Sequence, residues 1–206
     1  EDWKKHGRRY QLRAPEVYLA TPEVNPGYAW VLEDPETIAV EKLNGTNVKI
    51  KTENGRLVAA QNRKEPIDLL QLAHGKTFLA EGIFMAVQKD YVRPDGEQCG
   101  EIVGPKLQGN PYGLTLHLWY PFSRAIQYLS FRSFHEHART FENWSSWFRD
   151  HLKSRFSTKL VGPEQACLAE GVVFYNLKRR AAGASWMAKL RRDMFDWYYP
   201  DLRIAR

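Results

Sequence analysis

Two Asn-Gly pairs, at residues 44–45 and 54–55, bracket the segment that most constrains how this chain can fold. Between them, over 46–52, apolar side chains alternate with lysines, the period-two pattern typical of a half-buried strand. Asn-Gly accommodates the sharp reversals that antiparallel neighbours need. The sequence therefore predicts a strand over 37–40 that enters the first turn, the strand 46–52, and its hairpin partner over 56–61.

Lys42 stands directly before the first of these turns, between two predicted strands. A lysine held at the end of a sheet can face a cleft, where its amine is placed to attack a phosphorus or carbonyl centre. The same pattern also describes an ordinary surface turn with a solvated lysine, because charged side chains mostly lie on the surface. The rest of the chain has to decide between these two interpretations.

The composition indicates a folded protein with a polyanionic partner. The 206 residues suffice for one large domain or two small ones, and 43% hydrophobic with 13% aromatic residues argues against disorder. The net charge of +6 favours a partner such as nucleic acid. Because no repeat, low-complexity tract or linker divides the sequence, we predict a single domain over 1–206.

Cysteine usage and hydropathy indicate the compartment. Cys99 and Cys167 are too far apart for a local metal motif and too few for a disulfide framework, which predicts reduced thiols. No apolar run reaches membrane-spanning length, and the N-terminus lacks the apolar core of a signal peptide. We expect a cytoplasmic monomer with no membrane partner; a nuclear or viral origin, and a processed or trimmed N-terminus, stay open.

The remaining segments predict an α+β fold with a largely antiparallel sheet, since strands and helices do not alternate strictly. The expected elements are helices over 66–73 and 77–90, strands over 98–103, 114–120, 169–175 and 185–191, and a loop over 104–113. A capping box at Ser133 predicts another helix. Its apolar face would consist of Phe134, Ala138, Phe141, Trp144, Phe148 and Leu152.

Three further segments place charged side chains at the mouth or on one face of a predicted strand. Glu101 precedes an apolar pair, and Glu170 precedes the apolar run 171–174. Lys189 and Arg191 point to the same face of the last strand. Taken singly, each is most simply a solvated edge. Taken together with Lys42, in this order, they favour a catalytic site.

The ordered set resembles the motifs of the polynucleotide ligase and mRNA-capping superfamily of lysine nucleotidyltransferases, most closely the RNA ligase 2 type. EKLNGTN is similar to motif I, with Lys42 as the nucleophile, and its Thr46-Asn47 extension is typical of RNA ligases. The other similar segments are AAQNRKEP with Arg63 (motif Ia), GEIVGPKLQGNPYGL (III), LHLWYPF (IIIa), EGVVFY (IV) and MAKLRRDMF (V). The resemblance implies an ATP-grasp-like nucleotidyltransferase domain, with antiparallel sheets and flanking helices around a nucleotide cleft.

The chain departs from these motifs at three places. Arg191 stands where motif V usually has a second lysine, which keeps the charge but changes the donor geometry. Motif IIIa usually offers Phe or Tyr to the nucleotide; Trp119 aligns best here, with Tyr120 as the alternative. The sequence ends about 15 residues after motif V, without the OB-fold domain that DNA ligases and capping enzymes carry.

The resemblance implies an ATP-dependent RNA ligase that joins RNA 5′-phosphate and 3′-hydroxyl ends in three steps. Lys42 attacks the α-phosphate of ATP, the resulting lysyl-AMP passes AMP to the 5′-phosphate, and the 3′-hydroxyl displaces AMP. Glu101 and Glu170 would position Mg²⁺ or Mn²⁺. The implied nucleotide-binding residues are Glu41, Lys42, Leu43, Asn47, Arg63, Glu101, Trp119, Glu170, Lys189 and Arg191.

The resemblance implies several roles, and the residue types suit them. Arg63, Lys189 and Arg191, with the metal, would favour the neutral amine of Lys42 and stabilise the charge that develops on the phosphates. In the family the motif I acid, which Glu41 resembles, reads the adenine amino group, and Trp119 would stack on the base. Asn47 is a candidate for positioning the RNA 5′-phosphate.

Two other classes of function stay open. A DNA nick ligase or a GTP-dependent capping guanylyltransferase is disfavoured by the 44–47 run and by the missing OB domain. A non-catalytic RNA-binding module is disfavoured because folding requires none of Lys42, Glu101, Glu170 and Lys189. The basic runs 153–155 and 178–180 are predicted to be solvated, with RNA phosphates as the alternative partner. The RNA substrate, and an additional domain or protein that supplies RNA specificity, are left undetermined.

Overall fold

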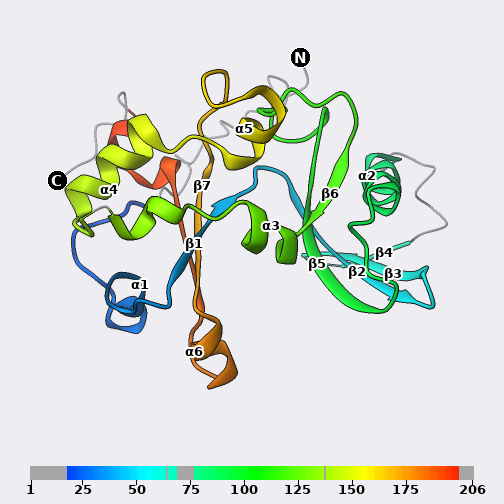
Figure 1. Ribbon diagram of the computed structural model, residues 1–206, viewed down its shortest axis with the longest axis horizontal. Coiled ribbons are helices and arrows are strands. Elements are labelled where there is room, and N and C mark those ends of the chain that lie inside the picture. The colour runs from blue at the N-terminus through cyan, green and yellow to red at the C-terminus, as the bar shows by residue number, and fades with distance from the viewer. Residues whose placement is uncertain (1–17, 64, 69–76, 137, 200–206) are drawn as a thin grey trace, which may run out of the picture.

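The chain folds around two antiparallel sheets (Figure 1). The computed structural model describes residues 18–63, 65–68, 77–136 and 138–199. Within these ranges one sheet has the order β1-β7-β8 and the other β4-β3-β2-β5-β6, and every strand pair is antiparallel. The strands are β1 (Ile38–Lys42), β2 (Thr46–Glu53), β3 (Arg56–Asn62), β4 (Pro66–Ile67), β5 (Gly96–Val103), β6 (Leu118–Pro121), β7 (Gly171–Tyr175) and β8 (Met187–Arg191). The predicted α+β fold with antiparallel sheets is confirmed.

The β2–β3 hairpin forms where the sequence predicts it. Asn54 and Gly55 have φ values of 51° and 74°, and two positive φ angles in succession are typical of the type I′ turn of a tight hairpin. Val48 and Ile50 are buried while the lysines between them are partly or fully exposed. The alternation in the sequence therefore sets which face of β2 packs inward, and β5 pairs with its other edge.

Helix α2 covers one face of the five-stranded sheet (Figure 1). The described helices are α1 (Trp30–Glu33), α2 (Thr77–Gln88), α3 (Phe122–Tyr128), α4 (Phe141–Ser146), a π-helix (Trp147–His151), α5 (Arg155–Val161) and α6 (Leu177–Ala181). A Cβ atom at Gly82 would lie 3.1 Å from Cγ2 of Ile102 and 3.3 Å from the backbone nitrogen of Trp119. The glycine that interrupts the helical pattern therefore lets α2 lie close against β5 and β6.

Short helices α5 and α6 depend on polar side chains at their first turns. Ser154 accepts a hydrogen bond from the backbone N–H of Ser157, and Asn176 accepts one from that of Arg179. Helices of this length are marginal by themselves and are stabilised by tertiary packing, which is why the sequence pattern did not predict them. None of the helices in the described ranges is long and apolar enough to cross a membrane.

Three groups of buried side chains form the core. One surrounds β1, β7 and α4, where Trp144 stacks on Phe174. A second lies between α2 and the five-stranded sheet. The third contains Val40 of β1, Tyr120 of β6 and Phe156 of α5, and so joins the two sheets. This third group of side chains therefore fixes the position of the two sheets relative to each other, on either side of the turn that follows Lys42.

Two predicted elements differ from the structure. Pro66–Ile67 pairs with β3 as a strand, so the helix predicted over 66–73 is wrong at its start, and 69–73 lie outside the described residues. The strand predicted over 114–120 is confined to 118–121. Asn110 explains the later start, because its side chain exchanges hydrogen bonds of 3.0 and 2.9 Å with the backbone N–H and C=O of Leu114.

The single helix predicted from Ser133 is broken into a 3-10 turn (Arg132–Glu136), α4 and the π-helix. Thr140 interrupts it with an extended backbone, and its hydroxyl accepts a hydrogen bond from the N–H of Asn143 at the start of α4. Ala138, predicted on the apolar face, is exposed. The predicted face residues that are buried are Phe134, Trp144, Phe148 and Leu152.

Candidate active site

Lys42 ends β1 and carries its amine to an ion pair with Glu170. The β1–β7 register places Lys42 opposite Gly171, so Glu170 is the next residue along the partner strand. The Lys42 Nζ lies 2.6 Å from Oε2 of Glu170, and the two side chains are 22% and 21% exposed. Two residues that the sequence predicted to share a site are thus in direct contact, although 128 positions separate them.

Glu101 reaches the same place from the other sheet. It lies in β5 directly opposite Asn47 of β2. Burial raises the pKa of Glu101 to about 7; the Lys42 charge opposes this rise, and the Glu170 charge adds to it. The two predicted carboxylates are therefore close enough to affect one another, and Lys42 lies near both.

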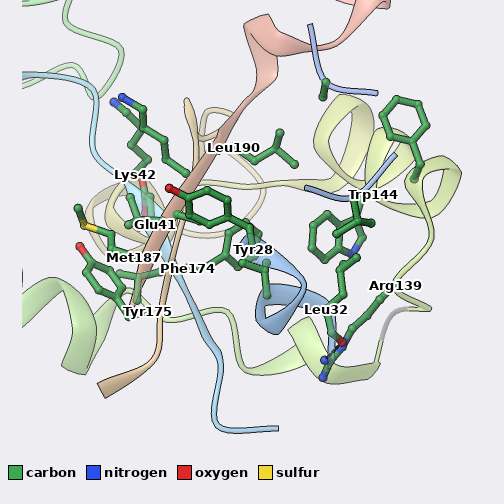
Figure 2. A pocket seen from close by; sticks show the side chains of 18 of the residues that line it. Tyr28, Leu32, Glu41, Lys42, Arg139, Trp144, Phe174, Tyr175, Met187 and Leu190 are labelled. Carbon is green, nitrogen blue, oxygen red and sulfur yellow. Dashed lines mark hydrogen bonds between the residues drawn. The ribbon is translucent and has the colours of Figure 1, made fainter. Parts of the chain in front are cut away.

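Two cavities meet at Lys42. The first, which we call the Lys42 cavity, has a volume of about 910 Å³ and extends from Lys42 to Trp144 and Arg139. Figure 2 shows Lys42 and Glu41 at one end of it and Trp144 and Arg139 at the other. The second, the Arg191 cavity, has a volume of about 800 Å³. The residues that line both are Lys42, Asn47, Arg63 and Glu101.

The three predicted cations line these cavities. Arg63 follows β3 and borders both, Lys189 of β8 borders the Lys42 cavity, and Arg191 borders the Arg191 cavity. In β8, Arg191 pairs with Gly171, the residue next to Glu170, and Lys189 pairs with Val173, two positions further along β7. The Arg191 Nε forms an ion pair with Oδ1 of Asp193 at 2.9 Å. The structure therefore brings positive charge to both sides of Lys42.

Glu41 is buried, with 2% of its surface exposed, and is held by the start of α5. One carboxylate oxygen accepts a hydrogen bond from the Ser154 hydroxyl at 2.6 Å, and the other accepts one from the Phe156 N–H at 2.7 Å. Burial raises the pKa of Glu41 to about 7, although both hydrogen bonds lower it. Glu41 and the neighbouring Leu43 both line the Lys42 cavity.

No short-range signal in the sequence connects Glu41 with α5. Ser154 and Phe156 stand 113 and 115 positions away from it. Ser154 alone offers a signal, since serine is a favoured residue before the first turn of a helix. A second missed contact is the hydroxyl of Tyr112, which accepts a hydrogen bond of 2.9 Å from the N–H of Asn44 in the turn after Lys42.

Trp119 lies outside both cavities. It is 0% exposed, packs between α2 and the sheet, and donates its indole N–H to the backbone oxygen of Val48 at 3.0 Å. The prediction that Trp119 stacks on a bound base is therefore wrong. The alternative, Tyr120, faces the other side of β6 and lines a different cavity, near Arg124.

Phe122 is the aromatic residue of this segment that borders the Lys42 cavity. It is the first residue of α3 and is partly buried beside Ala125 and Tyr175, which line the same cavity. Pro121 lacks a backbone N–H and ends β6, so the chain turns immediately before Phe122. Pro121 was the signal in the sequence that could have moved the predicted stacking residue from Trp119 to Phe122.

Glu101 and Glu170 are suited to a metal ion that retains water ligands. The described residues contain no group of three or more His, Cys, Asp or Glu side chains placed to hold a metal ion together. Mg²⁺ commonly binds through one or two carboxylates together with substrate phosphates. The pair of carboxylates therefore fits an ion that arrives with a nucleotide better than one that is permanently bound.

The two basic runs are partly engaged within the fold. The Lys178 amine pairs with Glu36 at 2.8 Å, and the Arg180 guanidinium lies 4.8 Å from the ring centre of Trp186. The Lys153 amine donates to the backbone oxygen of Ala166 at 3.1 Å. Their predicted alternative role, contact with RNA phosphates, stays a prediction.

The fold and the site define a class: two antiparallel sheets that meet at a strand-end lysine, flanked by carboxylates and lined by further cations. The comparison with protein families agrees, since the RNA ligase family model matches residues 35–191. The chain belongs to the RNA ligase family. The match spans the segments from β1 to β8 that carry the predicted motifs.

Solved structures similar to the chain include two of RNA ligase from Naegleria gruberi. One is a mutant with ATP and Mn, at 11% identity and a TM-score of 0.45, covering 91% of this chain and 59% of that one. Another is the ligase with PPi, at 13% identity and a TM-score of 0.47, covering 89% and 59%. The chain thus spans about 59% of the length of these ligases. No curated protein matches it in sequence.

Proposed function

We propose that this protein is an ATP-dependent RNA ligase that acts through a covalent lysyl-AMP at Lys42. The observation that supports this most strongly is the position of the Lys42 amine. It lies 2.6 Å from Glu170, at the point where the Lys42 and Arg191 cavities meet. An amine between two cavities can face a nucleotide in one and its second substrate in the other.

In the first step the Lys42 nitrogen attacks the α-phosphorus of ATP. The N–P bond forms, the bond from phosphorus to the pyrophosphate oxygen breaks, and the nitrogen passes one proton to water. A neutral amine is needed for this attack. Glu170 holds the amine at the strand end, so the pair has to separate before the nitrogen can bond to phosphorus.

The cations around Lys42 have the positions needed to bind phosphates. Arg63 borders both cavities, Lys189 borders one and Arg191 the other. Fixed positive charges around a phosphoryl group stabilise the charge that develops on it and on the leaving pyrophosphate. Arg191 is a planar donor able to bind two phosphate oxygens at once, in place of the second lysine usual in this motif.

Glu101 and Glu170 would hold a divalent ion, Mg²⁺ or Mn²⁺. Bound there with the nucleotide, the ion would supply positive charge to the phosphate oxygens. The high pKa of Glu101 fits this role, because a buried carboxyl next to a second carboxylate gains most from a nearby cation.

The nucleoside would occupy the Lys42 cavity. Glu41 is the proposed partner of the adenine amino group, since its carboxylate is fixed by two hydrogen bonds and borders the cavity. Phe122, in place of Trp119, is the proposed stacking partner of the base, and Leu43 is an apolar neighbour. A base held between apolar and aromatic side chains is stabilised by stacking on the aromatic ring.

The RNA ends would meet in the Arg191 cavity. Asn47 borders it and is the proposed contact of the RNA 5′-phosphate, to which AMP passes from Lys42. The 3′-hydroxyl then displaces AMP and seals the strand. Breaks in RNA are therefore the proposed substrate, as in RNA repair, with RNA specificity shared with a further domain or protein. Free thiols at Cys99 and Cys167 agree with a cytoplasmic setting.

Labelling with nucleotides tests the proposal directly. The protein is incubated with α-labelled ATP or GTP and Mg²⁺ or Mn²⁺, then resolved by denaturing electrophoresis. We expect label from ATP and none from GTP. Lys42→Ala should abolish it, while Lys49→Ala, which removes an exposed lysine paired with Glu97, should label normally. Label that survives in Lys42→Ala would refute the covalent role of Lys42.

A second experiment separates the remaining classes of function. Labelled protein is isolated and mixed with nicked RNA or nicked DNA duplexes that carry a 5′-phosphate. Sealing of RNA in preference to DNA supports the proposal. Preferential sealing of DNA would favour a DNA nick ligase, and label from GTP a capping enzyme. Folded protein, free of bound AMP, that takes no label would favour a non-catalytic RNA-binding module.

A further inference from the structure

A cavity of about 450 Å³ lies between α2, β6, α3 and α5. We call it the Arg124 cavity. Among the residues that line it are Lys89, Tyr91, Arg124, Tyr128, Phe156 and Lys159. Within the described part of the chain it shares no lining residue with the Lys42 cavity. Its volume falls in the range of sites that hold small organic molecules, so it can accept a nucleotide-sized group.

The Arg124 guanidinium is held by aromatic rings. Its central carbon lies 3.9 Å from the ring centre of Tyr91 and 4.8 Å from that of Tyr128. Its Nε atom is buried without a hydrogen-bond partner among the described residues. Cation–π contacts leave the charge of the guanidinium uncancelled. No carboxylate among the described lining residues pairs with the guanidinium, so its charge is available to an anionic ligand in the cavity.

The other charges at this cavity have the same sign. Lys159, an exposed residue of α5, places its amine 4.7 Å from the ring centre of Tyr128, and Lys89 lies exposed at the rim. Of the described residues that line the cavity, none is Asp or Glu. The nearby Glu81 is already paired with His117, which is itself a lining residue. An anion that enters the cavity therefore meets three cations and three tyrosine side chains, those of Tyr91, Tyr120 and Tyr128.

We infer that the Arg124 cavity binds an unpaired nucleotide of an RNA strand, with its phosphate at Arg124, Lys89 and Lys159 and its base against Tyr128. Tyr128 is 38% exposed, which leaves ring surface for stacking. Aromatic rings beside cations are the combination that binds single-stranded nucleic acid without sequence preference. That the nucleotide belongs to RNA rests on the proposed function. That the cavity suits an anionic ligand with a stacking ring rests on its charges and tyrosine rings alone.

Helix α5 connects this cavity with the proposed active site. Its first turn gives the Phe156 N–H to Glu41, next to Lys42, and its last turn carries Lys159 into the Arg124 cavity. The Phe156 ring also packs against Tyr120, 5.4 Å between centres. An RNA strand bound at Lys159 and Arg124 would therefore lie towards the other end of α5 from Glu41, the neighbour of Lys42.

The test is a binding measurement without ATP. A 12-nucleotide unpaired RNA with a fluorophore in place of its 5′-phosphate is titrated with the protein, and anisotropy is recorded at several salt concentrations. We expect Lys89→Gln/Lys159→Gln to weaken binding about ten-fold and to reduce the slope of log affinity against log salt by about 0.7 per lysine. Tyr128→Ala should weaken binding about ten-fold with the slope unchanged.

The matched control variants remove the same kinds of side chain, lysines and an aromatic ring, at positions outside the Arg124 cavity. Lys49→Gln/Lys51→Gln removes two exposed lysines that pair with Glu97 and Glu53, and Phe84→Ala removes an aromatic ring that is 61% exposed on α2. Both should bind RNA within about two-fold of the unchanged protein and keep its salt slope. Equal melting temperatures show that each variant is folded; all these positions are exposed, so large changes in stability are not expected.

Two results would overturn the inference. In one, the cavity variants bind RNA as the control variants do. In the other, AMP binds the unchanged protein and loses affinity in the Arg124-cavity variants as much as RNA does, which would make a free nucleotide the occupant. Labelling of the unchanged protein by ATP is measured without RNA, so a failure of the proposed function would show in that experiment and a failure of this inference in the anisotropy.

Discussion

In the Lys42 cavity the lysine amine lies 2.6 Å from the Glu170 carboxylate, with a second acid, Glu101, close by. In the Arg124 cavity the guanidinium instead lies over two tyrosine rings, 3.9 and 4.8 Å from their centres. The described lining of that cavity contains no acid. Both regions contain cations and lie close to α5, but the Lys42 amine is paired with a carboxylate and the Arg124 guanidinium with aromatic rings.

The difference is what we expect between a site for chemistry, the proposed role of the Lys42 cavity, and a site for binding, the proposed role of the Arg124 cavity. A carboxylate next to a lysine can exchange the amine for a metal ion, so the amine becomes available while the phosphates gain a cation. A cation on an aromatic ring has no such exchange partner, and its charge stays available for a phosphate. The predictions below test these two arrangements, in order of decreasing effect.

The buried carboxyl of Glu41, next to Lys42, predicts that the stability of the protein depends on pH. The pKa of Glu41 is about 7 in the fold, against 4.5 for a free side chain, so the folded protein holds a proton that the unfolded chain releases. The free energy of unfolding therefore falls as pH rises from about 4.5 to about 7, by about 3 kcal/mol for this group. Urea denaturation at pH 5 and pH 8 measures the fall.

Glu41→Gln should remove about half of the measured fall, because the variant has no proton to lose at this position while Glu101, whose pKa is also raised to about 7, keeps its own contribution. Glu97→Gln, which changes an exposed carboxylate, should retain it. If the Glu41 variant kept the full dependence on pH, the buried carboxyl would not be the source of the effect.

The pairing of Lys42 with Glu170 predicts a loss of activity. Glu170→Gln should lower the rate of labelling by ATP about 100-fold, the scale on which removal of one preorganised polar group affects an active site. The matched variant is again Glu97→Gln, which also removes a carboxylate paired with a lysine, Lys49, but on an exposed surface. Equal labelling rates in the two variants would make Glu170 an ordinary structural partner of Lys42.

The aromatic wall of the Lys42 cavity predicts a smaller effect on nucleotide binding. Phe122→Ala should raise the KM for ATP about ten-fold, because the base loses a stacking surface. Trp119→Phe should leave the KM of the folded protein unchanged, since Trp119 is buried behind the sheet. Single-turnover labelling at several ATP concentrations measures both, and the reverse result would restore the assignment that the sequence favoured.

The cation–π arrangement predicts the smallest effect. Arg124→Met should lower the free energy of unfolding by about 1 kcal/mol through loss of its contacts with Tyr91 and Tyr128. Lys51→Met, at an exposed position, should change it by less than about 0.5 kcal/mol. Chemical denaturation measures both, and equal values would mean that the rings do not stabilise the guanidinium.

Local patterns predicted the strands of this protein well. Alternation over 46–52 and positive φ angles at Asn54 and Gly55 act within a few residues, so the β2–β3 hairpin could be predicted before any contact was known. The helix predicted from Ser133 shows the limit of such patterns. Its apolar spacing continues through Thr140, but the hydroxyl of that residue starts a new helix instead of extending the old one.

The aromatic residue that borders the Lys42 cavity, Phe122, shows a second limit. Alternation along β6 predicts that Trp119 and Tyr120 face opposite sides, but not which side faces the core. The close approach of α2 at Gly82 decides this, since it covers Trp119. Phe122 then enters the Lys42 cavity because the chain turns after Pro121.

The sequence by itself determined the antiparallel strands, the strand-end lysine and the order of the charged residues that resemble RNA ligase motifs. Turn geometry and side-chain alternation depend on neighbours in the chain, which is why they could be predicted. Only the tertiary structure decided that Lys42 contacts Glu170, 128 positions away, and that α5 holds Glu41. Those contacts depend on the register of β1 with β7 and on the packing of α5 against β1, and neither leaves a local pattern in the sequence.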